Sequence, residues 1–260
     1  MFTNFLKLAL VSAVLATAQS SMAVESELVR SDLIRVRSRF AAQATVEAVN
    51  RHNEAVMASL PQATPGSSRV QSVPLAFADK LMQSIDTHPI TSWIGMYKYE
   101  RIDQGVNIGY CFGRATYAHL ALIKNGVDKN AVRKIWAVGP MNTGTIDWAF
   151  HVATIVRADN GEWITVDNFP GQVLTVRQWM EHMKLISTDG KLTFYITEAE
   201  KFSVSLGGYD RIQLGLDLSP EQDWYRNYFR DLMNWFGGPN ARPFFDDNGV
   251  MDLRLRGENI

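Results

Sequence analysis

The chain contains a single cysteine, Cys111, among its 260 residues, and this scarcity excludes several classes of protein. One cysteine cannot form an internal disulfide, and it cannot supply the paired ligands of zinc ribbons, thioredoxins or iron-sulfur clusters. No His-x-x-x-His pair, carboxylate cluster or phosphate-binding loop is present, so the sequence predicts no metal site and no cofactor. Cys111 is therefore expected to act as a free thiol or as a partner in an intermolecular bond.

The chain also lacks an excess of charge of either sign and has no long hydrophobic run. It has 26 Lys and Arg residues against 27 Asp and Glu residues, for a net charge of -1, and no basic run. Binding to nucleic acid depends mainly on Lys and Arg that neutralise phosphates, so we expect no nucleic-acid partner. After the first segment, no stretch reaches the length of about 18 consecutive apolar residues that a membrane helix needs.

Residues 1–23 have the pattern of a secretory signal peptide. Lys7 precedes an apolar stretch over residues 8–18, and Ser21 and Ala23 are small residues at the -3 and -1 positions of a cleavage site. The apolar stretch of about eleven residues is too short to cross a bilayer. We expect cleavage after Ala23, export to the periplasm or the medium, and no stable membrane anchor afterwards.

The rest of the chain divides into an arm and a domain. Residues 25–60 contain neither Pro nor Gly and predict a long helix, whereas residues 61–74 contain three prolines and three serines and predict a linker. We interpret 24–74 as a helical arm or pro-like segment with a linker, and 75–260 as a catalytic α+β domain with a C-terminal helical extension. Helices are expected at 75–86, 111–124, 176–186 and 221–236, strands at 132–138, 148–158, 163–167, 192–197 and 211–216, and a loop with weak strand signal at 87–110.

Cys111 lies at the start of a predicted helix, where a thiol is most easily activated. The unpaired N-H groups and the positive end of the helix dipole favour the thiolate, which is the nucleophilic form. The same N-H groups can hold a developing oxyanion. The alternative is a buried structural thiol, since free cysteine is among the most buried residue types.

A cysteine nucleophile needs a base, and His151 differs from the other histidines. It lies in the strand WAFHVATIVRA, which is apolar on both faces, and a buried imidazole requires a polar partner. His119 shares a helix with Cys111 but lies about 12 Å along its axis, out of reach of the thiol. The remaining histidines, His52, His88 and His182, have ordinary structural interpretations.

Asp167, at the end of the next strand, could orient His151 and complete a nucleophile-base-orienter triad. The two side chains share a face only if the hairpin has a three-residue loop over residues 159–161 with a left-handed Gly161. Asp167 would then lie opposite Ala153 and diagonal to His151. A two-residue loop would place the side chains on opposite faces, and Asp167 could also simply begin a turn.

Three segments, GYCFGRA, WAFHVATIV and WITVDNFP, resemble the bacterial protein-glutaminase (protein-glutamine deamidase) family over about residues 90–170. The resemblance implies a papain/transglutaminase-like core, in which the nucleophile at a helix N-terminus packs on an antiparallel sheet. It implies Cys111 as nucleophile, His151 as base and acid, and Asp167 as orienting group. It also implies an N-terminal pro-region, which the arm would supply. The chain departs from the family in lacking several cysteines and in its tail after Ser203.

The resulting hypothesis is an exported thiol amidohydrolase that converts glutamine side chains of a protein or peptide to glutamate and releases ammonia. Gln104 and Asn107 are candidate oxyanion donors, chosen for their proximity to Cys111, and Tyr110, Trp136 and Trp148 are candidates to line the approach to the thiol. A transglutaminase or a cysteine peptidase on the same core remains an alternative, because acceptor choice depends on the shape of the site. The non-enzymatic alternative is an exported interaction module in which Cys111 is buried.

Overall fold

The computed structural model describes residues 31–41, 44–63, 65–66, 69–102, 110–201, 203–206 and 226–237. Several predictions concern residues outside these ranges. They are the signal segment 1–23, the oxyanion donors Gln104 and Asn107, the strand at 211–216 and the first residues of the helix predicted at 221–236.

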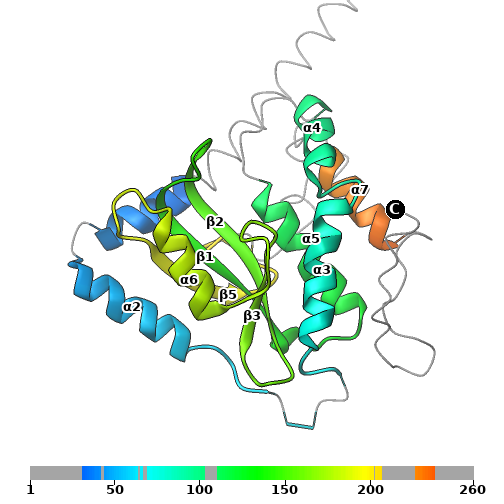
Figure 1. The fold of residues 1–260 in the computed structure, drawn as a ribbon, viewed down its shortest axis with the longest axis horizontal. Coiled ribbons are helices and arrows are strands. Elements are labelled where there is room, and N and C mark those ends of the chain that lie inside the picture. Colours follow the sequence, from blue (N-terminus) through cyan, green and yellow to red (C-terminus); the bar gives the residue numbers. More distant parts are fainter. Residues whose placement is uncertain are drawn as a thin grey trace, which may run out of the picture.

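A five-stranded antiparallel sheet forms the centre of the fold, which confirms the predicted α+β class (Figure 1). Its strand order is β4-β3-β2-β1-β5, so consecutive strands pair except where β5 adds beside β1. The strands are β1 (Val132–Asn142), β2 (Asp147–Arg157), β3 (Trp163–Val166), β4 (Leu174–Thr175) and β5 (Thr193–Glu198).

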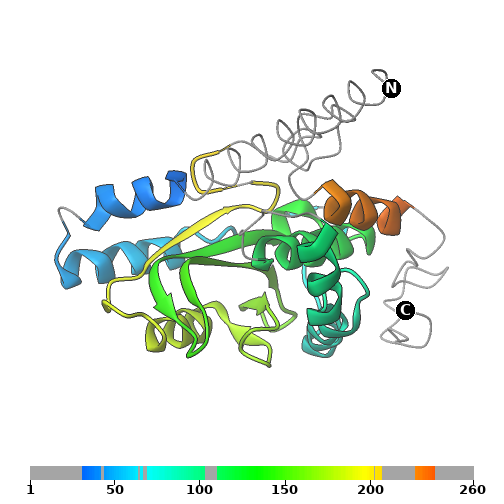
Figure 2. The ribbon, with the colours of Figure 1, turned by 90° about the horizontal axis from the view of Figure 1, so that it is seen from above.

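Both faces of the sheet are apolar, so both require a cover of helices. Side chains alternate along a strand, and on β1 Trp136 belongs to one core cluster whereas Ile135 belongs to the other. One face packs against α3 (Leu75–Thr87) and α5 (Cys111–Lys124), and the other against α2 (Val46–Ala58) and α6 (Val176–Leu185) (Figures 1 and 2). The C-terminal helix α7 (Arg226–Gly237) packs on the outer side of α5 (Figure 1). A 3-10 turn, Lys129–Ala131, leads into β1.

The N-terminal arm contains two helices, so the prediction of one unbroken helix over 25–60 is wrong. Residues 31–41 form the first helix, and α2 starts after Thr45. The Thr45 side chain accepts a hydrogen bond from the backbone N-H of Ala48 at 3.2 Å. Threonine hydroxyls compete in this way for backbone donors and favour a new helix start over continuation.

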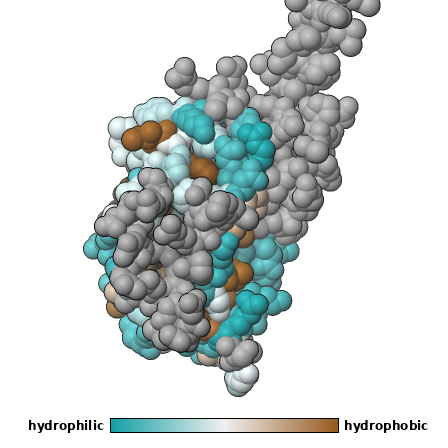
Figure 3. Space-filling view, turned by 90° about the vertical axis from the view of Figure 1, so that its right-hand side faces the viewer, coloured by the Kyte–Doolittle hydropathy of each residue, from teal (hydrophilic) through white to brown (hydrophobic). Residues whose placement is uncertain are grey.

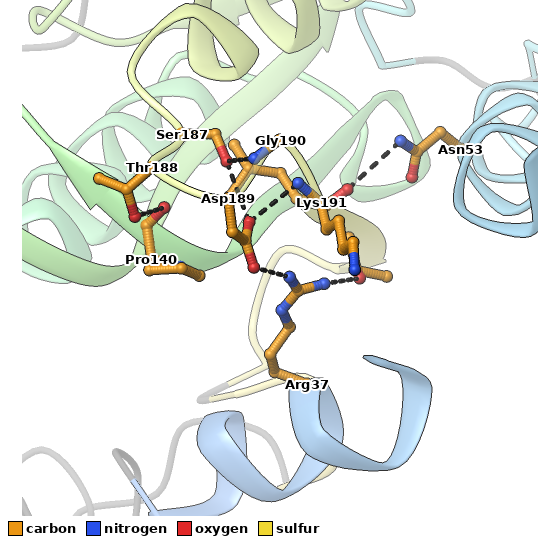
Figure 4. A network of polar contacts seen from close by, with 10 residues as sticks. Arg37, Asn53, Pro140, Ser187, Thr188, Asp189, Gly190 and Lys191 are labelled. Carbon is orange, nitrogen blue, oxygen red and sulfur yellow. Dashed lines mark hydrogen bonds and ion pairs between the residues drawn. The ribbon is translucent and has the colours of Figure 1, made fainter. Parts of the chain in front are cut away.

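The arm is joined to the domain by buried polar contacts along the edge strand β5. Arg37 donates to the Asp189 carboxylate at 2.6 Å and to the Thr193 hydroxyl at 3.2 Å (Figure 4). Asn53 of α2 accepts from the backbone N-H of Phe194 at 3.3 Å. These contacts cover an edge that would otherwise expose strand backbone.

Residues 87–110 contain a helix, α4 (Trp93–Ile102), where a loop with weak strand signal was predicted. Ser92 accepts a hydrogen bond from the Gly95 N-H at 3.2 Å and so helps the helix to start. Large apolar residues occur on both faces of α4, because Trp93, Ile94 and Tyr97 are exposed. That arrangement hides the helical period. Figure 3, which faces the side of α4 and α7, shows hydrophobic residues among hydrophilic ones. None of the described helices is long and apolar enough to span a membrane.

Candidate active site

Cys111 is the first residue of α5 and is buried, with 8% of its surface exposed. The helix starts at Cys111 without a side-chain cap from Tyr110. Its first turns pack on β2, where the Thr154 hydroxyl donates to the Ala115 carbonyl at 2.6 Å. The positive end of the α5 dipole therefore points at the thiol, and it does so in a setting of low dielectric.

His151 and Asp167 form a buried pair beside this helix end. The Nε2 atom of His151 lies 2.8 Å from Oδ2 of Asp167, and the two side chains are 2% and 5% exposed. An ionised carboxylate only accepts hydrogen bonds, so Nε2 is the donor. The pair thus fixes which nitrogen of the imidazole remains for other contacts.

The β2-β3 hairpin has the register that the sequence analysis required for this pair. Thr154 pairs with Val166, which places Asp167 opposite Ala153 and diagonal to His151. The Ala158 N-H donates to the Glu162 carbonyl at 2.8 Å, and Gly161 has a φ of 85°. The predicted three-residue loop with a left-handed glycine is confirmed.

Asp167 accepts two further hydrogen bonds that hold it in place. Trp179 donates its indole N-H to Oδ2 at 2.7 Å, and the backbone N-H of Phe169 donates to Oδ1 at 3.1 Å. Trp179 lies one turn into α6, whose start is fixed by a capping box between Thr175 and Gln178. The carboxylate therefore has no freedom to turn away from His151.

The second ring nitrogen of His151, Nδ1, is the one available to the thiol. It is buried, and among the described residues it has no partner of regular hydrogen-bond geometry. Burial lowers the pKa of His151, but the charge and hydrogen bond of Asp167, with a hydrogen bond and charge from Cys111, outweigh burial and raise it to about 10. The thiol is thus within hydrogen-bonding reach of the ring, on the side that Asp167 does not occupy.

The pKa of Asp167 responds to the same contacts. Burial raises it, but the His151 charge and the hydrogen bonds from His151, Trp179 and the Phe169 N-H outweigh burial and hold the pKa below its usual value. Both shifts favour the imidazolium-carboxylate form of the pair over the pair of neutral groups. A buried imidazolium is the form that can protonate a leaving group.

Aromatic rings surround the His151 imidazole. Trp148 stacks on it at a centroid distance of 4.8 Å and an interplanar angle of 10°. Phe169 meets it edge-on at 5.6 Å, and Trp179 lies at 5.9 Å. Trp148 was predicted from the sequence to lie near the thiol, but Phe169 and Trp179 were not, because nothing in their local sequence pattern points towards His151.

Two residues predicted to line the approach to the thiol are buried instead. Trp136 is fully buried between Phe112 and Phe150 and donates to the Thr197 hydroxyl at 3.0 Å, so it is a core residue and that prediction is wrong. Tyr110 is also buried, against the Tyr228 ring of α7 at 5.7 Å.

The other histidines lie away from the thiol in structural positions. His52 contacts the Phe194 carbonyl at 3.1 Å, and His88 accepts from the N-H groups of Ile90 and Thr91. His119 and His182 lie on α5 and α6. Within the described ranges, no group of three or more His, Cys, Asp or Glu side chains could hold a metal ion.

Comparison with known proteins gives one weak structural likeness. No protein-family model and no curated protein matches the chain. Among solved structures, the NMR structure of protein-glutaminase from Chryseobacterium proteolyticum is similar with a TM-score of 0.39 and 18% identity, over 67% of this chain and 94% of that chain.

Proposed function

We propose that the protein is an exported thiol amidohydrolase that deamidates glutamine side chains of a protein or peptide. The observation that carries the proposal is the position of His151, which holds Asp167 on one ring nitrogen and leaves the other to Cys111. Acyl transfer through a thiol requires a nucleophile, a base beside the nucleophile and a group that orients the base.

In the first half of the reaction, Cys111 acts as the nucleophile. The imidazolium of His151 and the N-terminus of α5 stabilise its thiolate. The thiolate attacks the carboxamide carbon of glutamine, and the oxyanion rests on the Cys111 backbone N-H and one upstream donor, for which Gln104 and Asn107 are candidates. The proton of His151 passes to the departing nitrogen, ammonia leaves, and a thioester remains.

In the second half, neutral His151 removes a proton from water. The hydroxide attacks the thioester carbon, and the C–S bond then breaks. This step releases glutamate and regenerates the Cys111 thiolate. The sum is one water consumed and one ammonia released for each glutamine. Asp167 keeps the imidazole in one orientation through both proton transfers.

The arrangement also supports the proposed type of core. The nucleophile begins a helix that packs on an antiparallel sheet, and the base lies on β2 of that sheet. We extend the proposal to a papain/transglutaminase-like core and to export through the segment 1–23.

The experiment measures ammonia release from a glutamine-containing peptide and from casein, with mass spectrometry of the products. The purified protein is compared with Cys111→Ala and His151→Gln, and His52→Gln is the matched control because Gln can keep a hydrogen bond to the Phe194 carbonyl. We expect a mass gain of about 1 Da per site, the amide-to-acid change of thiol-mediated hydrolysis. The gain should depend on Cys111 and His151 but not on His52.

Other products would contradict the proposal in recognisable ways. Incorporation of an added amine would indicate a transglutaminase, and cleaved backbone would indicate a peptidase. No product, together with slow alkylation of Cys111 in the folded protein, would favour an interaction module with a buried structural thiol.

A further inference from the structure

Trp148 makes the closest ring contact of His151. Its indole lies parallel to the imidazole within 10° at a centroid distance of 4.8 Å, and Phe169 packs against its ring at 4.8 Å. Trp148 is only half-buried, whereas His151 is 2% exposed. The indole thus covers the imidazole on the side towards solvent.

This stacking requires a break in the alternation of β2. Trp148 and His151 are three residues apart, so in a regular strand they would point to opposite faces. The register between β1 and β2 shifts between Val138 and Met141, where Gly139 and Pro140 lie opposite one residue. Beyond the shift, Met141 and Trp148 pair and pack in the core cluster of the His151 face, although Phe150 packs in the other cluster.

The bulge depends on a glycine in the sequence, Gly139. Gly139 has a φ of 148°, a conformation that side chains rarely adopt, and a Cβ there would lie 2.8 Å from Leu192. Bulges increase the local twist of a strand and re-aim its side chains, often beside active sites. Here the extra residue lies in β1, opposite Ala149, which is next to Trp148 in β2.

We propose that Trp148 is a positioning residue that holds the imidazole of His151 and stabilises its protonated form by stacking. The inference rests on the proposed function, since it assigns Trp148 a part in the thiolate-imidazolium pair. A cation over an aromatic face is attracted by the quadrupole of the ring, and indole is the best such face. Loss of that contact makes the protonated form of His151, which supplies the proton in the first half of the reaction, less stable relative to the neutral form.

Among the residues that the structure describes, Asp167 and Cys111 are the titratable groups that act on His151, and both favour the protonated ring. α6 faces it with Trp179, and β1 places Ala137 beside it. A change in the titration of His151 on substitution of Trp148 therefore reports the loss of the indole.

The test compares Trp148→Leu with the conservative Trp148→Phe in the full chain. His151 is titrated by NMR through its ring protons, assigned by their absence in His151→Gln, and Cys111 is alkylated with iodoacetamide across the same pH range. Cys111 is the single cysteine, so alkylation reports on it alone. We expect Trp148→Leu to lower the His151 midpoint by roughly one unit, to move the change in alkylation rate that accompanies His151 deprotonation to lower pH by the same amount, and to slow ammonia release. Trp148→Phe should retain most of each property.

Trp93→Leu is the matched control, because Trp93 is exposed on α4 and should alter none of these curves. An unchanged His151 midpoint and alkylation profile in Trp148→Leu would overturn the proposal. So would equal effects of Leu and Phe, which would indicate loss of packing rather than loss of an aromatic face. If the wild-type protein releases no ammonia yet the midpoint shifts as expected, the positioning role stands and the proposed function fails.

Discussion

Gly113 lies against the hydroxyl end of the Tyr228 ring, so that a Cβ at Gly113 would lie 2.5 Å from both Cε1 and Cζ of that ring. Gly113 belongs to the first turn of α5, two residues after Cys111, and Tyr228 belongs to α7. The C-terminal helix therefore packs on the helix turn that carries the thiol, and a glycine permits the approach.

Replacing Gly113 with alanine should destabilise the protein. Alanine is the better helix former by about 1 kcal/mol, but overpacking against a buried ring costs about 1–3 kcal/mol. We expect a lower free energy of unfolding, measured by urea denaturation. In a Tyr228→Ala background the ring is gone, so Gly113→Ala should become neutral or stabilising. Equal destabilisation in both backgrounds would show that the ring is not the cause.

Trp179→Phe should test the hydrogen bond that Trp179 donates to Asp167. A hydrogen bond to a charged group contributes about 1.5–3 kcal/mol, whereas one to a neutral group contributes about 1 kcal/mol. Trp136→Phe is the matched comparison, because the equally buried Trp136 donates to the neutral hydroxyl of Thr197. Unfolding experiments should show the larger loss for Trp179→Phe, and ammonia release should decline with it. The reverse order would argue against a role for Trp179 in holding Asp167.

The relation between His151 and Asp167 could be derived from the sequence because the turn that connects their strands is short. A three-residue loop with a left-handed glycine sets the register, and the register sets which side chains share a face. Each step involves residues within one hairpin. The start of α5 at Cys111 is equally local, since a helix pattern follows the cysteine directly.

The remaining features depend on contacts between distant segments or on local irregularities. Trp148 stacks on His151 although the two are three residues apart in β2, at a place where β1 carries a bulge, and a bulge in one strand cannot be seen in the sequence of its neighbour. Tyr228 contacts Gly113 although more than a hundred residues separate them in the sequence, and no pattern in α5 predicts this contact. α4 was missed because its exposed apolar residues conceal the helical period.

Cleavage between the arm and the domain should not activate the protein. An inhibitory pro-segment would cover the thiol, but the described part of the arm packs along β5 and against α6. Glu54 of α2 pairs with Arg177 of α6 through two contacts of 2.8 and 3.0 Å. Asp32 accepts hydrogen bonds from Ser203 and Ser205, and Val49 and Val56 are buried. We therefore interpret the arm as part of the folded unit.

The measurement uses a protease site introduced in the linker near residues 61–63, followed by size-exclusion chromatography and alkylation of Cys111. We expect the cut arm to remain bound, with an alkylation rate equal to that of the uncut protein. Dissociation of the arm together with faster alkylation would favour the pro-segment interpretation.

Acid should destabilise the protein at a higher pH than the titration of its carboxylates would suggest. Burial lowers the pKa of His88 to about 3, and burial with the nearby Lys134 charge lowers the pKa of His119 to about 3. In the unfolded chain both titrate near 6.5. The unfolded state therefore binds more protons below pH 6.5, so stability is fully present above that pH and declines as the pH falls towards 3, by about 1.4 kcal/mol per pH unit for each histidine.

Urea unfolding at several pH values between 4.5 and 6.5 isolates this effect, because carboxylates in unfolded chains titrate near 4. His151 does not oppose it, since a raised pKa withdraws stability only as the pH rises from 6.5 towards 10. His88→Gln should lower the pH dependence in this window by the contribution of one histidine, about 1.4 kcal/mol per pH unit. A slope unchanged by His88→Gln would mean that His88 is already protonated in the folded protein between Tyr117 and Trp235, whose rings lie 4.6 and 4.4 Å from it and could stabilise the cation.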